Sequence, residues 1–221
     1  SDSFSSLIRH AYSPTSFEAA AMEWQRILSG HLNVVSRGES AVLNWADPEE
    51  QIKDAESWMV RPLYTQDSDF ISGVSAILQK MLNCGQNLHH PHYIGHQVPA
   101  CVPIAGLFDA VSSVTNQVMA IYEMGPWATA VEHALVRALC RKVGWLADNS
   151  SGLLTHGGSL ANLTALLTAR NVALPGSWED GVPHNAVLVA HPDAHYCVTR
   201  SAGILGLGTK QVFKAAADSQ G

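Results

Sequence analysis

A chain of 221 residues is long enough to form one sizeable domain or two small ones. Hydrophobic residues make up 47% and charged residues 14%, a balance that supports a packed core and argues against disorder. The formal net charge of -6 and the lack of a basic run argue against a nucleic-acid-binding surface, and no apolar run approaches the ~18 residues of a membrane span.

The cysteines lie far apart in the sequence and form no C-x-x-C pair. They are Cys84, Cys101, Cys140 and Cys197. This spacing is typical of reduced thiols buried in a core rather than of a disulfide framework. We therefore expect a cytoplasmic protein.

The first hundred residues have mainly helical patterns. Residues 16–28 place six side chains on one helical stripe: Phe17, Ala20, Ala21, Trp24, Ile27 and Leu28. Residues 47–59 begin with Asp47 as an expected N-cap and Pro48 at the first helical position. A third helix is expected over 69–82.

Two long helical patterns follow, over 104–124 and 126–144, separated by Gly125. Pro126 suits a helix start and Gly144 a helix end. From residue 152, short apolar strands are expected to alternate with helices. A strand over GLLTH leads into a helix over 158–171, and 186–191 has the continuous apolar run of a buried parallel strand. A helix over 195–206 and a strand over 210–215 complete an order that predicts an α/β fold with crossover helices.

The stretch GLLTHGGSLANLTALL, residues 152–167, places two glycines and a serine at the start of a helix. Unpaired backbone N–H groups and the helix dipole make such a turn an anion site. The same residues fit a plain glycine turn with Ser159 as the N-cap. They also resemble the hydrolase nucleophile elbow G-x-S-x-G, with Ala161 in the last place and Asp193 and His195 as candidate partners. The pattern leaves these three interpretations open.

Two histidine-containing segments are further candidates for function. His195 follows the expected strand 186–191, and ligands of open α/β sheets bind at that carboxyl edge. Its imidazole could ligate a metal, move protons or lie flat against an aromatic ligand, with a structural role as the alternative.

The second segment, HHPHYIGHQVP over 89–99, holds four histidines within eight residues. His92 and His96 have the i, i+4 spacing of a helical metal site, but the prolines and Gly95 disfavour a helix. We expect no metal here, and instead an irregular loop that lines a pocket.

Four stretches together resemble the group II pyridoxal-phosphate-dependent amino-acid decarboxylases, which include glutamate, aromatic-amino-acid and L-2,4-diaminobutyrate decarboxylases. The stretches are HPHYIGHQVP, MGPWATAVEHALVRAL, GLLTHGGSLANLTALLTAR and DAHYCVTRSAGILGLG, in the family's order. The resemblance runs from about residue 50 to the end. It implies an α/β fold-type I transferase-like large domain, of which residues 101–221 would be the first, incomplete part. A helical segment with a substrate loop, over 1–100, would precede it.

The resemblance also implies pyridoxal 5'-phosphate as cofactor, an amino-acid substrate and a homodimer, without nucleic-acid or membrane partners. His156, Gly157, Gly158 and Ser159 match the turn that holds the cofactor phosphate. His195 matches the imidazole that stacks on the pyridine ring and assists a protonation.

The resemblance further places a substrate contact in the loop that precedes these motifs. His96 and Gln97 match that position, and the polar Gln97 favours an acidic or diamino-acid substrate. The segment 122–129 matches a part of the family near the active site and the dimer interface.

The chain departs from the family in its lysines. In the family, the Schiff-base lysine follows a histidine in a His-Lys pair. The lysines here, Lys53, Lys80, Lys142, Lys210 and Lys214, include no such pair. The aspartate that pairs with the pyridine nitrogen is also expected further along. We therefore expect the N-terminal half of a decarboxylase, which alone cannot convert an amino acid to its amine and CO2. The alternative is an inactive scaffold or dimerisation fragment.

Overall fold

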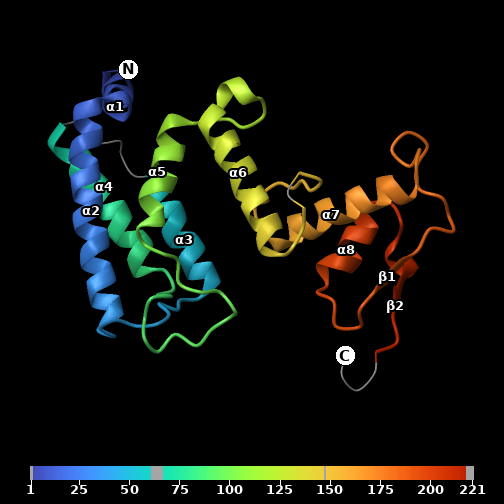
Figure 1. Ribbon diagram of the computed structural model, residues 1–221. Helices are drawn as coiled ribbons and strands as arrows, with labels where there is room; N and C mark the ends of the chain where they lie inside the picture. Colours follow the sequence, from blue (N-terminus) through green and yellow to red (C-terminus); the bar gives the residue numbers. More distant parts are fainter. Residues whose placement is uncertain (1, 61–66, 147, 218–221) are drawn as a thin grey trace. The chain divides into compact units, whose positions relative to one another are not determined.

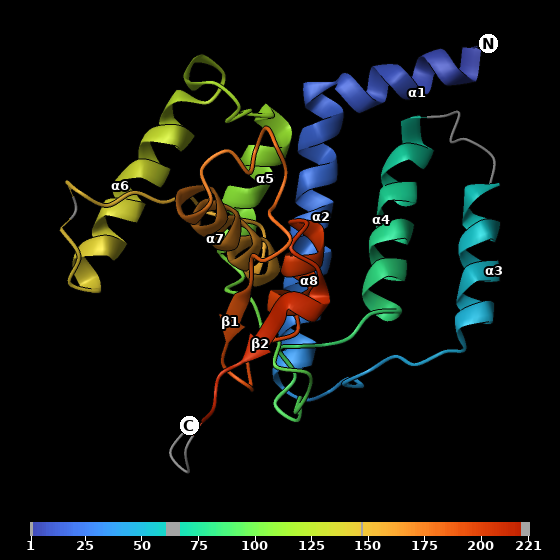
Figure 2. The same ribbon diagram turned by 90° about the vertical axis from the view of Figure 1, so that its right-hand side faces the viewer.

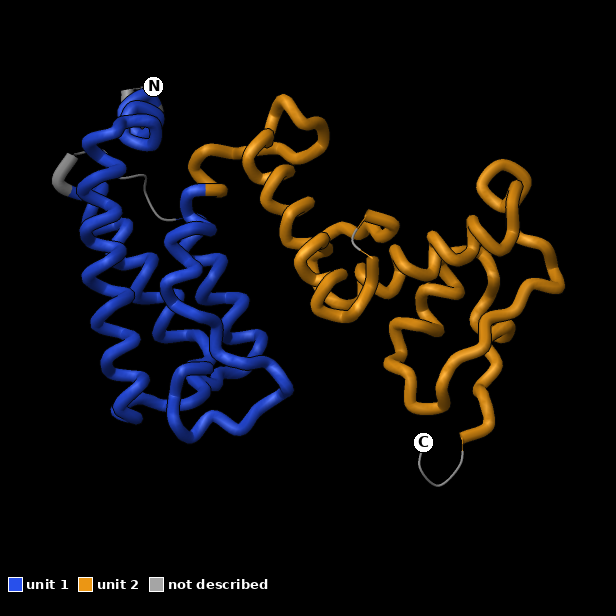
Figure 3. Tube along the Cα trace, in the orientation of Figure 1, with its two compact units in different colours: residues 1–111 blue, residues 112–221 orange. Residues whose placement is uncertain are grey.

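The computed structural model describes residues 2–60, 67–146 and 148–217 (Figure 1). The chain forms two compact units, residues 1–111 and 112–221 (Figure 3). The functional domains expected to meet near residue 100 stay a prediction.

The first unit is built from α1 (Asp2–Tyr12), α2 (Pro14–Ser36), α3 (Pro48–Met59), α4 (Asp67–Asn83) and most of α5 (Ala105–Thr115). Helices α2 and α4 lie side by side in both views (Figure 1 and Figure 2). Of the stripe predicted on α2, Ile27 is buried, whereas Phe17 at its N-terminal end is exposed.

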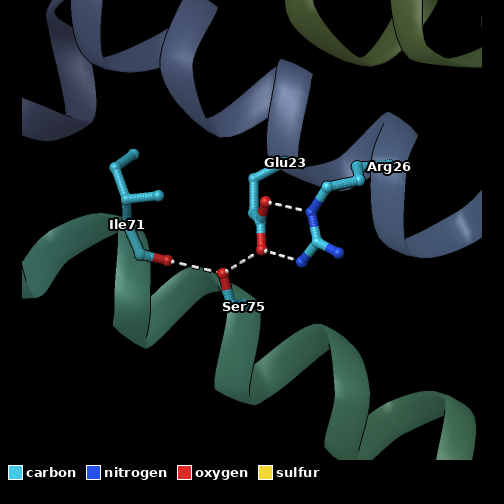
Figure 4. Close-up of polar contacts among 4 residues, drawn as sticks. All are labelled: Glu23, Arg26, Ile71 and Ser75. Atoms are coloured by element: carbon cyan, nitrogen blue, oxygen red, sulfur yellow. Dashed lines mark hydrogen bonds and ion pairs between the residues drawn. The ribbon is translucent and has the colours of Figure 1, made fainter.

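A polar cluster joins α2 to α4 (Figure 4). The Glu23 carboxylate accepts two hydrogen bonds from the Arg26 guanidinium, at 2.6 and 2.8 Å. The Ser75 hydroxyl, on α4, lies 2.7 Å from Glu23 Oε1 and 3.0 Å from the Ile71 carbonyl oxygen. The hydrogen bond from Arg26 and then that from Ser75 lower the pKa of Glu23 from 4.5 to about 2. Glu23 is therefore a carboxylate at neutral pH.

Helix α3 begins as predicted. The Asp47 side chain caps it by accepting a hydrogen bond from the Glu49 backbone N–H at 2.9 Å, and Pro48 occupies the first helical position. An ion pair between Lys80 and Asp54 links α3 to α4.

The single long helix predicted over 104–124 is wrong. Helix α5 ends at Thr115, Asn116 has a left-handed φ of 48°, and only the short helix η1 (Tyr122–Met124) follows. The break occurs at Asn116 because asparagine adopts the left-handed conformation more easily than other non-glycine residues. The apolar periodicity of this stretch continues through the break and does not reveal it.

The second unit contains α6 (Pro126–Lys142), α7 (Gly158–Ala173), β1 (Leu188–Ala190), α8 (Cys197–Ile204), η2 (Thr209–Gln211) and β2 (Val212–Lys214). Strands β1 and β2 are parallel, with Leu188 opposite Val212. The chain passes from β1 through α8 to β2, which is the predicted crossover, and α8 packs on α7 (Figure 1). Helix α6 begins at Pro126 as predicted, and Gly144 follows its end with a φ of 83°.

Two expectations about strands are wrong within the described residues. GLLTH, over 152–156, forms no ladder, and the Leu154 N–H donates instead to a carboxylate oxygen of Glu132 on α6, at 2.8 Å. β1 is not buried, since Val189 is 67% exposed. A parallel strand is buried by neighbouring strands and by helices on both faces, and the described sheet has only two strands.

The prediction of buried thiols holds for two of the cysteines. Cys140 and Cys197 are buried, whereas Cys84 is half-buried and Cys101 is exposed. Cys101 lies in an irregular segment, where its carbonyl oxygen accepts a hydrogen bond from His89 Nε2 at 2.8 Å. Within the described residues, none of the helices combines the length and the apolar character needed to cross a membrane.

Candidate functional site

The turn that precedes α7 leaves its backbone open. Gly157 is the N-cap, with φ 94° and ψ 152°, and no side chain caps the helix. The Gly158, Ser159 and Leu160 amides precede the first intrahelical bond, which runs from Ala161 N–H to the Gly157 carbonyl oxygen at 3.2 Å. Ser159 is thus the second helical residue, and the alternative in which it is the N-cap is wrong. Glycine replaces it as cap because the chain enters the helix through a conformation that residues with a Cβ avoid.

Two hydrogen bonds with Thr155 hold the same turn in place. Its carbonyl oxygen accepts from the Gly157 N–H at 3.0 Å, and its hydroxyl donates to the Gly157 carbonyl oxygen at 3.2 Å. The space beside the glycines is open, since a Cβ built on either Gly157 or Gly158 meets no atom within 4 Å. The turn is therefore fixed and accessible, and amides without an intrahelical partner at a helix start are the donors that a phosphate requires. His156, beside these glycines, is exposed.

His195 lies between β1 and α8, beyond the carboxyl end of β1, as predicted. Its ring is exposed, and its Nδ1 accepts a hydrogen bond from the Cys197 backbone N–H at 3.3 Å. The neutral ring therefore carries its proton on Nε2. The Tyr196 ring lies against it at a centroid distance of 4.1 Å, and the Arg200 guanidinium lies 4.6 Å from the centre of the Tyr196 ring.

In the second unit, the glycine turn and His195 lie at the starts of two helices, α7 and α8, that pack together. Near their N-terminal ends, the Asn162 side-chain amide of α7 donates to the Cys197 sulfur of α8, at 3.1 Å. Sequence reasoning missed the Asn162, Cys197, Tyr196 and Arg200 contacts. The only signal for them is their short spacing from Ser159 and His195, which does not show which residues face one another.

His96 and Gln97 belong to the first unit, so their part in the site stays a prediction. Both are exposed in an irregular loop. Gln97 has a left-handed φ of 50°, and its N–H donates to the Gly95 carbonyl oxygen at 2.7 Å. Such strain in a residue that is not glycine is concentrated at binding and catalytic sites.

The structure gives no support to the nucleophile elbow. An elbow places its serine on a strained turn, but Ser159 lies in the first turn of a regular helix, and the strained residue is Gly157. Asp193 does not orient His195 either, because its backbone N–H donates to His191 Nδ1 and the His195 Nδ1 is bonded to Cys197. In the described ranges, no three His, Cys, Asp or Glu side chains are grouped to hold a metal ion.

Comparisons with known proteins show which family this chain resembles. Residues 61–218 match the model of the pyridoxal-dependent decarboxylase conserved domain. The chain is 31% identical over 155 residues to L-2,4-diaminobutyrate decarboxylase of Rhizobium meliloti, covering 68% of this chain and 30% of that protein. It is 26% identical over 185 residues to cysteine sulfinic acid decarboxylase of Homo sapiens, covering 81% and 36%.

Solved structures share the fold. The crystal structure of mouse CSAD gives a TM-score of 0.79 at 22% identity, covering 95% of this chain and 44% of that chain. The glutamate decarboxylase domain of diaminobutyrate-pyruvate transaminase and L-2,4-diaminobutyrate decarboxylase from Vibrio parahaemolyticus gives 0.76 at 25% identity, covering 93% and 45%. These matches confirm the family resemblance and the α/β fold class. The chain spans about a third of the length of the curated relatives, 30% and 36%.

Proposed function

Because this chain belongs to the family of pyridoxal-dependent decarboxylases, we propose that it is part of an enzyme that releases the α-carboxylate of an L-amino acid as CO2 and leaves an amine. Family membership implies pyridoxal 5'-phosphate as the cofactor. The observation that carries the proposal is the open, fixed glycine turn at the start of α7, because a dianionic phosphate binds best to unpaired amides at a helix N-terminus.

The residues of the turn divide the work of holding the phosphate. The amides of Gly158 and Ser159 would donate to it, and the Ser159 hydroxyl would add a further donor. His156 lies beside the turn. When bound, pyridoxal phosphate supplies an electron sink for the electron pair left by the departing carboxylate.

His195 serves the reaction from the neighbouring strand end. Its ring would contact the cofactor ring, and Nε2 of the neutral imidazole holds the proton because Nδ1 accepts from the Cys197 backbone N–H. In this position His195 is the residue that delivers a proton during turnover.

His96 and Gln97 contact the substrate. The amide side chain of Gln97 can donate to a carboxylate and accept from an ammonium group, which suits an acidic or a diamino-acid substrate. The left-handed φ of Gln97 supports a functional position. The names of the relatives, which include glutamate and L-2,4-diaminobutyrate decarboxylases, point to the same substrate classes.

The assembly we propose is a homodimer in the cytoplasm. Trp127 and Val114 are 79% and 63% exposed, and large exposed apolar side chains are typical of surfaces that a partner covers. The cysteines are all free thiols, which suits a reducing compartment. Sedimentation velocity of the complete protein that contains this chain should give a dimer mass.

The function is tested by assaying that complete protein with a panel of L-amino acids. We expect CO2 release that depends on added pyridoxal phosphate, with acidic or diamino acids preferred over tryptophan. Ser159→Ala should weaken pyridoxal phosphate binding about tenfold, because a charge-assisted hydrogen bond is lost. Ser151→Ala, on an exposed serine before the turn, is the control and should leave binding unchanged. No cofactor-dependent CO2 from any substrate would refute the proposal.

A further inference from the structure

The glycine turn lies at the start of α7 and His195 lies just before α8, and one residue contacts both α7 and His195. Cys197, the first residue of α8, is 2% exposed. Its sulfur accepts the hydrogen bond from Asn162 Nδ2 of α7 at 3.1 Å, and its backbone N–H donates to His195 Nδ1 at 3.3 Å. The two bonds form a continuous path from α7 to the imidazole.

A local backbone bond also holds the start of α8, from the Val198 N–H to the His195 carbonyl oxygen at 3.0 Å, but the N-cap side chain contributes nothing. Its N-cap is Tyr196, which has helical φ and ψ of -54° and -20° and makes no side-chain cap hydrogen bond. A helix start without a cap frays unless tertiary contacts hold it. The Asn162 bond to the buried Cys197 sulfur supplies such a contact. It acts on the same residue whose backbone N–H donates to His195 Nδ1.

Asn162 also belongs to the helix whose first residues form the glycine turn. It lies four residues after Gly158, so it is fixed by the first turn of α7, whose amides face the anion site. A rigid helix transmits any displacement at this end directly to the Asn162 side chain. The residue therefore ties the position of α8 to that of the phosphate site.

We propose that Asn162 is a positioning residue that, through Cys197, fixes the orientation and the protonated nitrogen of His195 relative to the phosphate site. The inference rests on the proposed function for its role in catalysis, but the link itself exists without the cofactor. Asn162 does not touch the reacting atoms.

The test compares variants that remove the link with variants that keep it. Asn162→Ala removes the donor and Cys197→Ala removes the acceptor. Cys197→Ser keeps an acceptor at the same place, and Asn171→Ala makes the same change as Asn162→Ala at the far end of α7. Circular dichroism confirms that each variant is folded.

The first readout is the side-chain ¹⁵N spectrum of His195 in histidine-labelled, cofactor-free protein at a pH where the ring is neutral. We expect wild type, Cys197→Ser and Asn171→Ala to show the form protonated on Nε2. Asn162→Ala and Cys197→Ala should show exchange between the two neutral forms. An unchanged spectrum in both of these variants would overturn the inference.

The second readout is catalysis by the complete protein. Asn162→Ala should lower kcat about tenfold and change KM less than about twofold, as expected for a residue that orients a catalytic group without binding substrate. If wild type decarboxylates and Asn162→Ala is as active as wild type, the inference fails and the proposed function stands. If wild type binds no pyridoxal phosphate, the proposed function fails, and the ¹⁵N comparison still decides whether the link exists.

Discussion

Gly157 has a backbone conformation that only glycine adopts readily, with φ 94° and ψ 152°. We predict that Gly157→Ala lowers the free energy of unfolding by about 1–3 kcal/mol, the usual cost of such strain in a residue with a Cβ. The loss cannot come from a clash with another part of the fold, because beyond its chain neighbours a Cβ at this position meets no atom within 4 Å. Urea denaturation measures it.

Gly158 is the matched control for this prediction. A Cβ there also meets nothing within 4 Å, but the residue lies in the first turn of a regular helix. Gly158→Ala should leave stability unchanged or raise it by up to about 1 kcal/mol, since alanine is the better helix former. Equal losses in the two variants would show that the φ of Gly157 is not the cause.

Replacing Gln97 by glycine is expected to maintain or raise stability and to weaken substrate binding. Its left-handed φ of 50° is strained, so Gln97→Gly should leave the free energy of unfolding unchanged or raise it by up to about 1 kcal/mol. If its side chain binds the substrate, the same change should raise KM about tenfold through the loss of a hydrogen bond. Thermal unfolding and steady-state kinetics provide the two measurements.

The control for Gln97 is Asn116, the other described residue with a left-handed φ that is not glycine. Asn116→Gly removes comparable strain at the end of α5 and should leave KM unchanged. A KM that does not respond to Gln97→Gly, or that responds equally to both changes, would remove Gln97 from the substrate site.

Between elements, the Glu23 cluster is the polar link that joins α2 to α4 (Figure 4). The pKa of Glu23 is lowered from 4.5 to about 2 in the folded protein, so the carboxylate stabilises the fold above pH 4.5 and this contribution is lost as the pH falls toward 2. Glu23→Gln should lower the urea midpoint at pH 7. The difference from wild type should shrink between pH 4.5 and 2.

Glu39 provides the comparison, because it also accepts two hydrogen bonds from an arginine, Arg37, and the pair holds the pKa of Glu39 below its usual value. Both residues lie just after α2, where the pair joins no second helix. Glu39→Gln should therefore change the midpoint at pH 7 less than Glu23→Gln does. An equal effect would mean that the Ser75 link between the helices adds nothing.

Element boundaries were predictable where a local signal fixes them. Asp47 with Pro48, and Pro126, mark helix starts that the structure confirms. The break at Asn116 was not predictable, because the apolar periodicity continues through it. The burial of the strand over 186–191 was also wrong, since burial depends on neighbouring strands and helices that a local pattern does not contain.

For the whole molecule, the sequence correctly placed His195 beyond a strand end and two glycines at a helix start, since both follow from local pattern and topology. It also allowed Ser159 as the N-cap, one of three open interpretations, because a serine near a helix start is normally one; the structure gives that place to Gly157. The Asn162 contact with Cys197 joins residues 35 positions apart, and only the packing of α7 on α8 brings them together.

The lysines of this chain lead to a prediction about the molecule as a whole. Lys80 pairs with Asp54, and Lys214 Nζ donates to the His191 carbonyl oxygen at 3.3 Å. None of the five lysines follows a histidine. The 221-residue chain treated with one equivalent of pyridoxal phosphate and then borohydride should therefore carry its label spread over several lysines.

Peptide mass spectrometry measures that distribution, with Lys214→Arg as the most informative variant because Lys214 lies at the edge of the sheet near His191. The variant should leave the total label nearly unchanged. A longer protein that joins this chain to a His-Lys pair should instead carry the label on that lysine. We propose that this chain supplies the phosphate site and His195, and that the Schiff-base lysine is not among its five lysines. Stoichiometric labelling of one of these lysines, abolished when that lysine is replaced, would contradict this proposal.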